Sequence, residues 1–416
     1  MQQSIEIMAP AGSPESLTAA VKAGCNSVYF GIEQLNMRAR SSSNFTLDDL
    51  RDIAKRCKEA NVKTYLTLNT ILYDHDLRLM RKIIDTAKES GISAVIASDH
   101  AAMAYAKQVG LPVHISTQAN ITNIETVQFY AAFADVMVLS RELSLNQVKS
   151  ITREIEKRKI TGPSGELIRI EVFAHGALCM AVSGKCYLSL HSNNASANRG
   201  ACIQNCRRSY IVTDKEDGHE LEIDNEYIMS AKDLCTIDFL DKVIDTGVRI
   251  LKIEGRGRSA DYVHTTVSCY RQAADAVLNN TFTPEKAQAW KNELSTVFNR
   301  GFWDGYYLGR KLGEWSDSYG SKATEKKHYI GRAIKYFRKA EVAEFKLETG
   351  ELSIGDTILI TGPTTGVVRF EVDEIREAEL PVNMVKKGHS ISIKVPERIR
   401  ASDKLFKIEP NEIQLN

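Results

Sequence analysis

The strongest constraint on the fold is an alternation of short β-branched segments with longer amphipathic segments over the first 255 residues. Eight segments have the composition of buried strands, and helical patterns follow most of them. They span residues 4–10, 27–32, 63–69, 94–98, 112–118, 135–140, 168–174 and 249–255. Strands that alternate with helices pair in parallel, so the sequence predicts an α/β fold with a (β/α)8 TIM-like barrel. A doubly wound sheet is the alternative, because the pattern does not determine whether the sheet closes.

Boundary signals mark two of the helices. Ser13 precedes an amphipathic segment that stops at Gly24, which is the arrangement of a capped helix with a glycine end. Thr46 stands three residues before Asp49, which is the spacing of a capping box. These signals predict helices that begin just after Ser13 and Thr46.

The pattern changes near residue 320, where short strands joined by Gly, Pro and Asp turns replace the helices. The sequence therefore predicts a barrel domain over 1–320 and a small all-β barrel over 321–416. The stretch "SIGDTILITGPTTG" resembles the strand–turn–strand of translation-factor barrel domains, which favours an RNA-facing accessory role for the second domain.

The strand spacing is interrupted once, between the seventh and eighth predicted strands, which about 75 residues separate. This insertion contains the cysteine loop, residues 176–210, which holds four of the eight cysteines: Cys179, Cys186, Cys202 and Cys206. The loops that follow barrel strands build the active face of such enzymes. The cysteine loop is therefore expected where the chemistry occurs.

The chain gives no sign of secretion or membrane insertion. Its start, "MQQSIEIMAPAGSPES", lacks a basic segment followed by an apolar run, and no stretch approaches the roughly 18 apolar residues of a membrane span. We therefore expect a cytoplasmic protein without a membrane partner. Cytosolic reducing conditions argue against disulfides, so the clustered cysteines indicate an iron–sulfur cluster, zinc or free thiols.

The overall charge does not drive nucleic-acid binding, because the formal net charge is only +1. One local segment, "KKHYIGRAIKYFRK" at 326–339, holds six Lys or Arg, one His and three aromatic residues without an acid. This composition fits either a solvated basic face or an RNA contact.

Two candidate catalytic residues lie on the seventh predicted strand. His175 ends the strand, where it could lie beside a cluster or donate a proton, or serve as a hydrogen-bonded core histidine. Glu171 shares its face with Phe173 and His175 if the strand alternates regularly. A carboxylate inside a barrel needs a cation, which Lys252 or Arg169 could supply, so Glu171 is also expected to be structural.

Polar side chains follow several predicted strands, where barrel enzymes bind their ligands. Arginine suits carboxylates and phosphates, because its guanidinium donates two parallel hydrogen bonds. Helix caps, turns and surface salt bridges account for such residues equally well. The candidate substrate-binding residues are Arg38 and Arg40, Asn69, Gln118 and Asn120, and Arg256, Arg258 and Tyr262.

One segment of the cysteine loop carries a family signature. "EVFAHGALCMAVSGKCYLS" resembles the motif E-x-F-x-x-G-(A/S)-L-C-x4-G-x-C-x-L-S of the collagenase-like peptidase family U32, and every fixed position is present. The resemblance extends from "APAG" at 9–12 through "KIEGRGRSADYV" at 252–263 and includes the C-terminal strands. It therefore covers nearly the whole chain.

The resemblance implies RNA hydroxylation more than proteolysis. The better-understood members are oxygen-independent hydroxylases that carry a [4Fe–4S] cluster on four cysteines, which correspond to Cys179, Cys186, Cys202 and Cys206. "NRGACIQNCRRSY" and "YIMSAKDL" resemble the members that convert the wobble uridine of tRNA to 5-hydroxyuridine with prephenate as co-substrate. Prephenate carries two carboxylates, for which Arg256 and Arg258 would be hosts. Arg208 departs from the tryptophan of that pattern.

Two other functions remain as alternatives. One is a collagenase-like peptidase, although the sequence contains neither H-E-x-x-H nor G-x-S-x-G. The other is a zinc-stabilised, noncatalytic RNA-binding protein.

Overall fold

The structure is a computed structural model that describes residues 4–39, 44–208, 212–213, 216, 220–221, 229–309, 313–316 and 320–411. Eight parallel strands form a ring in which each strand pairs with the next and the last, β11, pairs with both β7 and β1. The strands are β1 (Glu6–Pro10), β2 (Ser27–Phe30), β3 (Lys63–Leu68), β4 (Ala94–Ala97), β5 (Val113–Ile115), β6 (Val136–Val138), β7 (Arg169–Ala177) and β11 (Ile250–Ile253). The predicted TIM-like barrel is confirmed, and the doubly wound alternative is wrong.

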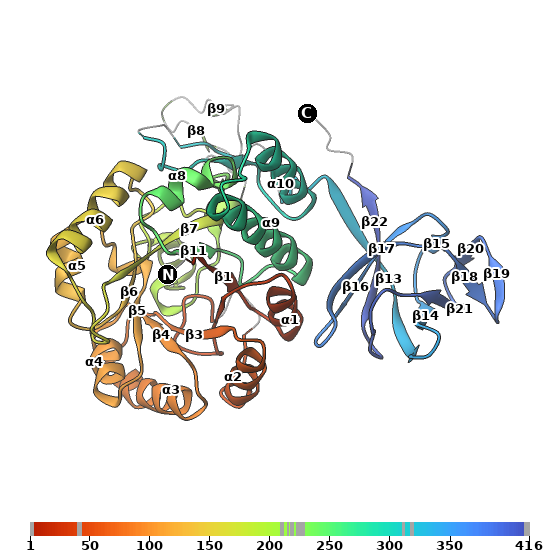
Figure 1. The fold of residues 1–416 in the computed structure, drawn as a ribbon, viewed down its shortest axis with the longest axis horizontal. Helices are drawn as coiled ribbons and strands as arrows, with labels where there is room; N and C mark the ends of the chain where they lie inside the picture. Colours follow the sequence, from red (N-terminus) through yellow and green to blue (C-terminus); the bar gives the residue numbers. More distant parts are fainter. Residues whose placement is uncertain are drawn as a thin grey trace.

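Helices surround the barrel (Figure 1). The outer ring comprises α1 (Pro14–Lys22), α2 (Asp49–Glu59), α3 (Leu77–Glu89), α4 (His100–Val109), α5 (Ile124–Tyr130), α6 (Leu145–Arg158), α8 (Leu240–Asp245), α9 (Ala260–Leu278) and α10 (Pro284–Thr296). The hydroxyl of Ser13 accepts a hydrogen bond from the backbone N–H of Ser16 at 3.2 Å, as the cap predicts. The backbone N–H and hydroxyl of Thr46 both donate to Asp49, although α2 begins only at Asp49.

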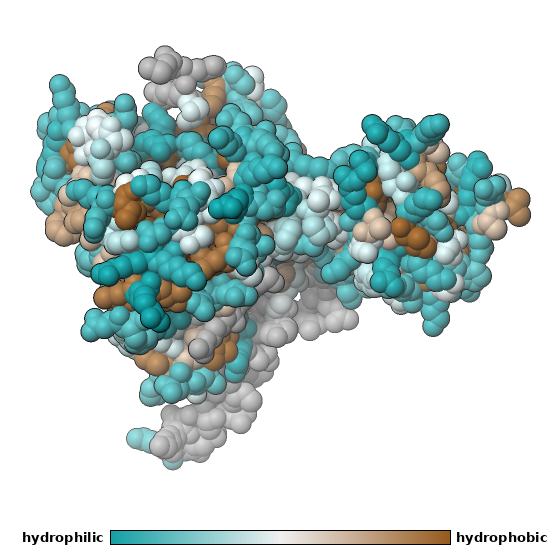
Figure 2. Space-filling model, turned by 90° about the horizontal axis from the view of Figure 1, so that it is seen from below, coloured by the Kyte–Doolittle hydropathy of each residue, from teal (hydrophilic) through white to brown (hydrophobic). Residues whose placement is uncertain are grey.

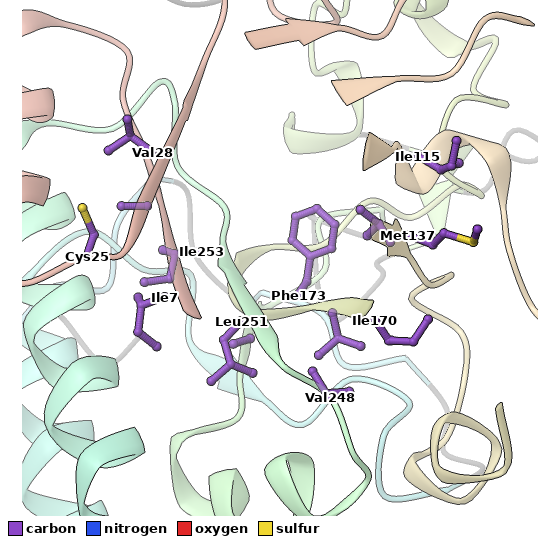
Figure 3. Close-up of a cluster of buried hydrophobic side chains, with 14 of the residues drawn as sticks. Ile7, Cys25, Val28, Ile115, Met137, Ile170, Phe173, Val248, Leu251 and Ile253 are labelled. Carbon is purple, nitrogen blue, oxygen red and sulfur yellow. The ribbon is translucent and has the colours of Figure 1, made fainter. Parts of the chain in front are cut away.

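Every barrel strand is buried along most of its length, as expected for parallel strands covered on both faces. Side chains that alternate outward pack against the helices, and Figure 3 shows Ile7 beside Leu251, its neighbour across the β1–β11 pairing. Inward-pointing Met8, Tyr29, Tyr65 and Ile250 form a smaller cluster. The barrel therefore has a packed interior rather than a channel.

Short elements extend the barrel at one edge. The strand β10 (Asp233–Cys235) pairs antiparallel with the end of β7, and β12 (Phe302–Trp303) pairs with β10. Within the insertion, α7 (Leu188–Asn193) and the two-residue strands β8 (Val212–Thr213) and β9 (Glu220–Leu221) follow β7. The insertion thus adds to the face on which β7 ends.

The C-terminal part consists of antiparallel strands around a second core (Figure 1). Eight of them form one sheet in the order β17-β16-β22-β13-β14-β21-β18-β19, and β15 pairs with β20. Their bounds are β13 (Glu325–Phe337), β14 (Val342–Leu347), β15 (Glu351–Ser353), β16 (Thr357–Gly362), β17 (Gly366–Glu371), β18 (Ile375–Glu377), β19 (Leu380–Val382), β20 (Met384–Lys386), β21 (Ser390–Lys394) and β22 (Lys404–Pro410). The antiparallel C-terminal fold was predicted from the turn pattern.

The two parts contact each other through α1 and α9 on the barrel and the β16–β17 hairpin. Ala19 and Ala260 pack against Leu359 and Val367, and the hydroxyl of Thr18 donates to the carbonyl of residue 363 at 2.6 Å. The space-filling view shows two lobes joined at this contact, each with small hydrophobic patches among hydrophilic side chains (Figure 2). Among the described residues, the helices are too short or too polar to cross a membrane.

Candidate active site

A cavity of about 580 Å³ lies at the carboxyl ends of the barrel strands. Its walls include Asn69 directly after β3, Ser116 directly after β5, Ala177 at the end of β7 and Gly255 just after β11. The cysteine loop supplies another wall, from Cys179 to Arg207. This is the end of the barrel at which such enzymes place their active sites.

All four cysteines of the loop line this cavity. Cys179 is exposed, and Cys186, Cys202 and Cys206 are partly exposed. Burial raises the pKa of the Cys206 thiol, Arg207 lowers it, and the other three thiols raise it further, so the four groups interact electrostatically. In the part of the chain that the structure describes, no three or more His, Cys, Asp or Glu side chains are arranged to ligate a metal ion. The donor set, four thiols on one cavity, nevertheless fits a cluster or zinc by its chemistry.

Tight backbone contacts hold the cysteine loop against the barrel. Gly200 has φ +83°, and a Cβ there would overlap the carbonyl oxygen of Asn36. Gly176 has φ +103°, and a Cβ would lie 2.5 Å from the carbonyl oxygen of Glu254. Arg207 donates to the carbonyl of Leu178 at 2.6 Å. The glycines therefore permit an approach that a side chain would prevent.

The cavity wall is strongly cationic. Seven of the described residues that line it are Lys or Arg, and Glu254 is the single acid among them. The cations are Arg38, Arg141, Arg207, Lys252, Arg256, Arg258 and Arg300. An anionic ligand therefore suits the cavity better than a cationic one.

Two buried carboxylates support these cations. Lys252 lies 2.7 Å from Glu171, and its ammonium lies 4.5 Å from the ring centroid of Tyr29. Burial raises the pKa of Glu171, although Lys252 lowers it. Burial also raises the pKa of Glu254, but Arg38 and Arg141 lower it more, so the net pKa is lowered and Glu254 is ionised.

The arginines of the cavity are held mostly by neutral groups. Arg256 donates to the amide oxygen of Asn36 at 3.0 Å and to the hydroxyl of Thr67 at 2.8 Å, and burial lowers its pKa. Arg258 stacks 3.5 Å from the ring centroid of Phe298, and burial lowers its pKa too. Such partners fix the guanidinium groups without cancelling their charge.

Two further cations of the cavity wall are held differently from each other. Arg141 lies 3.7 Å from the ring centroid of Phe173 and donates to the carbonyl of Ala177 at 3.0 Å. Arg300 pairs with Asp233 at 3.4 Å, and burial lowers its pKa to about 10. Arg300 is therefore paired with an acid, and Arg141, which is held by neutral groups, also interacts electrostatically with Glu254.

The structure brings five of the predicted substrate-binding residues to the cavity: Arg38, Asn69, Gln118, Arg256 and Arg258. Asn120 stands behind the wall and donates to the carbonyl of Ser183 in the cysteine loop at 3.3 Å. Tyr262 is buried, and its hydroxyl donates to the carbonyl of Glu254 at 2.8 Å. Arg40 lies outside the described residues.

His175 does not line the cavity. The expectation that it shares the inward face of Glu171 and Phe173 is wrong, because a register shift lies between the pairs Lys252–Phe173 and Ile253–His175. This irregularity turns His175 into the layer between β7 and α9, where its ring lies 5.5 Å from Tyr270. Burial lowers its pKa to about 3, so the imidazole is neutral. The position favours a core role.

Five charged lining residues were not among the predicted site residues: Arg141, Arg207, Lys252, Glu254 and Arg300. Lys252 and Glu254 alternate with Arg256 on and after β11, which was a usable signal. Arg141 follows β6 by three residues and could have been inferred in the same way. Nothing in the local sequence marks Arg207 or Arg300.

The chain is similar to proteins named as collagenases and to proteins named for RNA hydroxylation. The sequence model of peptidase family U32 matches residues 12–317. A protein named "Collagenase" from Porphyromonas gingivalis is 58% identical over 98% of each chain. A "tRNA hydroxylation protein P" from Helicobacter pylori is 31% identical over 74% of this chain and 72% of its own. A 23S rRNA 5-hydroxycytidine synthase from Escherichia coli is 31% identical over 74% of this chain and 46% of its own.

Proposed function

The chain belongs to peptidase family U32, and from that premise we propose that it is an iron–sulfur enzyme that hydroxylates the wobble uridine of tRNA with prephenate as co-substrate. The observation that carries the proposal is a single cavity lined by four cysteines and seven cations. Similarity to RNA hydroxylation proteins supports RNA as the substrate class. Cytoplasmic action on tRNA is part of the same proposal.

Cys179, Cys186, Cys202 and Cys206 would hold the [4Fe–4S] cluster. The cluster would supply one-electron redox chemistry when bound. Arg38 is close enough to the cysteines to interact with them electrostatically. Burial lowers the pKa of Arg38, but Glu254 and the thiols of Cys179 and Cys202 raise it more. A cation beside several thiolates offsets their mutual repulsion.

The remaining cations would bind and orient the carboxylates of prephenate. Arg258 is fixed by its stacking on Phe298, and Lys252 by Glu171, so both can meet an anion without first being ordered. Because fixed guanidinium groups bind carboxylates in a defined plane, they would also set the orientation of the co-substrate.

The C-terminal sheet would contribute weaker RNA contacts. In the basic segment on β13, Lys327 pairs with Asp261 at 2.5 Å and Arg332 with Glu348 at 2.8 Å, which removes part of its excess charge. Lys335 lies 5.0 Å from the exposed ring of Phe337. The segment therefore suits an accessory contact better than the main binding surface.

The test combines metal analysis with nucleoside analysis. After anaerobic purification, the wild-type protein should contain about four irons and four labile sulfides per chain, and Cys202→Ser should lose them. Cys25→Ser, a buried cysteine remote from the cavity, is the matched control and should retain them. Cells that lack the gene should lose 5-hydroxyuridine from their tRNA and regain it with the wild type and Cys25→Ser, but not with Cys202→Ser.

Stoichiometric zinc without sulfide would contradict the proposal and favour the zinc-stabilised RNA-binding protein. Restored 5-hydroxyuridine with Cys202→Ser would exclude a role for the cluster.

A peptidase is the second candidate, because the relative that is 58% identical is named "Collagenase". A cysteine or metallopeptidase needs a thiol with a base or a metal-bound water. No histidine is among the described residues that line the cavity. Cleavage of gelatin by homogeneous, metal-free wild-type protein, lost on Cys202→Ser or another single cysteine substitution, would establish the peptidase instead.

A further inference from the structure

Large apolar and aromatic side chains are exposed around the mouth of the cavity. They belong to two segments, the cysteine loop and the loop that follows β3, and they are Ile71, Tyr73, Met180, Val182, Tyr187 and Ile203. Met180 and Val182 line the cavity itself. Scattered single apolar side chains are normal on a protein surface, but a group beside one cavity indicates a binding surface. We call these six residues the collar.

The two loops of the collar are bound to each other. The backbone N–H of Ile71 donates to the carbonyl of Asn198 at 3.1 Å. Arg199 donates in return to the carbonyl of Ile71 at 2.8 Å. Asn69 and Ala197, which flank these contacts in the sequence, both line the cavity. The part of the collar that follows β3 is therefore held against the cysteine loop, next to residues of the cavity wall.

Tyr73 presents a fixed aromatic surface on this rim. Its side chain is 55% exposed, and the guanidinium carbon of Arg199 lies 4.2 Å from its ring centroid. Arg199 is held in turn by the carboxylate of Asp76, whose pKa it lowers, while the backbone N–H of Tyr73 also donates to Asp76 at 2.8 Å. The stack is thus ordered before any ligand arrives, which reduces the entropy cost of binding.

Tyr187 presents a second aromatic surface. It is 69% exposed and stands between Cys186 and Leu188, which both line the cavity. Its position places an aromatic face directly beside the cation-lined cavity.

Single-stranded RNA matches this combination of surfaces. Its bases stack on aromatic faces and on arginine planes, and its phosphates are attracted by cations. We propose that Tyr73, positioned by Arg199, and Tyr187 stack against the bases that flank the target nucleotide while that nucleotide enters the cavity. This inference rests on the proposed function for RNA as the substrate class, and it assigns the part of the surface that binds it.

The test measures binding of an unmodified tRNA anticodon stem–loop by fluorescence anisotropy. Removing one base–aromatic stack costs about 1–3 kcal/mol, so Tyr73→Ala and Tyr187→Ala should each raise the Kd roughly tenfold. Tyr73→Phe and Tyr187→Phe keep the ring and should bind almost as the wild type does, which separates stacking from misfolding. Phe129→Ala removes a ring of similar exposure, 59%, from α5 on the outside of the barrel and serves as the control.

The dependence of Kd on salt gives a second readout. Neither tyrosine carries a charge, so the slope of log Kd against log salt should be unchanged in both alanine variants. A Kd that remains within twofold of the wild-type value in both alanine variants would overturn the proposal that the collar binds RNA. So would a wild-type protein that does not bind the stem–loop. If the collar is confirmed but cells make no 5-hydroxyuridine, the proposed reaction fails alone. If 5-hydroxyuridine is made normally by both alanine variants with unchanged binding, the collar fails alone.

Discussion

Replacing Lys252 with methionine tests how the barrel interior supports its charged residues. Methionine keeps an unbranched apolar side chain but removes the ammonium group that lies 2.7 Å from Glu171. Glu171 is fully buried, and its second carboxylate oxygen has no hydrogen-bond partner among the described residues. Breaking one side of a buried pair leaves an uncompensated charge and costs about 3–5 kcal/mol. Lys252→Met should lower the free energy of unfolding by that amount.

The loss should depend on pH. Burial already raises the pKa of Glu171, and removing Lys252 raises it further. A group whose pKa is raised in the folded state contributes stability at low pH and loses it as the pH rises through the folded pKa. The variant should therefore be less destabilised near pH 5, where Glu171 can be protonated, than near pH 8.

The assay is urea unfolding followed by circular dichroism at both pH values. Lys157→Met, which breaks an exposed pair with Glu154, is the control and should change the midpoint little at either pH. The double variant Lys252→Met/Glu171→Gln removes the unpaired charge and should recover part of the loss at pH 8. A loss in Lys252→Met no larger than in the control, or the same at both pH values, would refute this account of the pair.

Two further predictions concern the surroundings of the cavity. Burial lowers the pKa of His175 to about 3, so its imidazole should stay neutral from pH 8 to pH 5. Its contribution to the stability of the fold should fall only as the pH drops below 6.5, the ordinary pKa of histidine. A ring resonance in the NMR spectrum, assigned with His175→Gln, that titrates near pH 6.5 would contradict this. Gly200→Ala should be destabilised more than Gly165→Ala in urea, because both have positive φ but only a Cβ at Gly200 meets a neighbouring backbone, that of Asn36; equal midpoints would show that the contact does not matter.

The fold was predictable because the local sequence pattern identifies each barrel strand. The segment predicted as a strand at 63–69 is β3 (Lys63–Leu68), and the helix capped by Ser13 begins one residue later. Alternating β-branched runs and amphipathic helices leave few other architectures for the chain. Closure of the sheet was not predictable, because the β11–β7 pairing joins segments about 75 residues apart. Neither segment carries a sequence pattern that identifies the other as its partner.

The candidate site was predictable only where its residues follow strands or share one loop. Arg256 and Arg258 lie just after β11, and the carboxyl ends of the barrel strands surround the cavity, so the barrel fold itself places both residues there. Arg207 and Arg300 come from separate segments and look like surface arginines in the sequence. His175 was assigned to the wrong face because period-two alternation holds only in a regular ladder, and the irregularity opposite Ile253 is a property of the pairing, not of either strand alone.

The partners of the cavity cations bear on what the site binds. Arg256 is held by an amide and a hydroxyl, Arg141 by a carbonyl and a ring, and Arg207 by two carbonyls. Neutral partners orient a guanidinium without pairing its charge, and Glu254, the single acid among the described lining residues, compensates only part of the positive charge of the wall. Buried charge that is not compensated opposes folding. Carboxylate partners would have stabilised the fold at least as well while cancelling the positive potential. A cavity wall with neutral partners keeps its positive electrostatic potential, but the fold is less stable for it. We infer that bound anions offset this loss, because a ligand that binds only the folded state also stabilises the folded state.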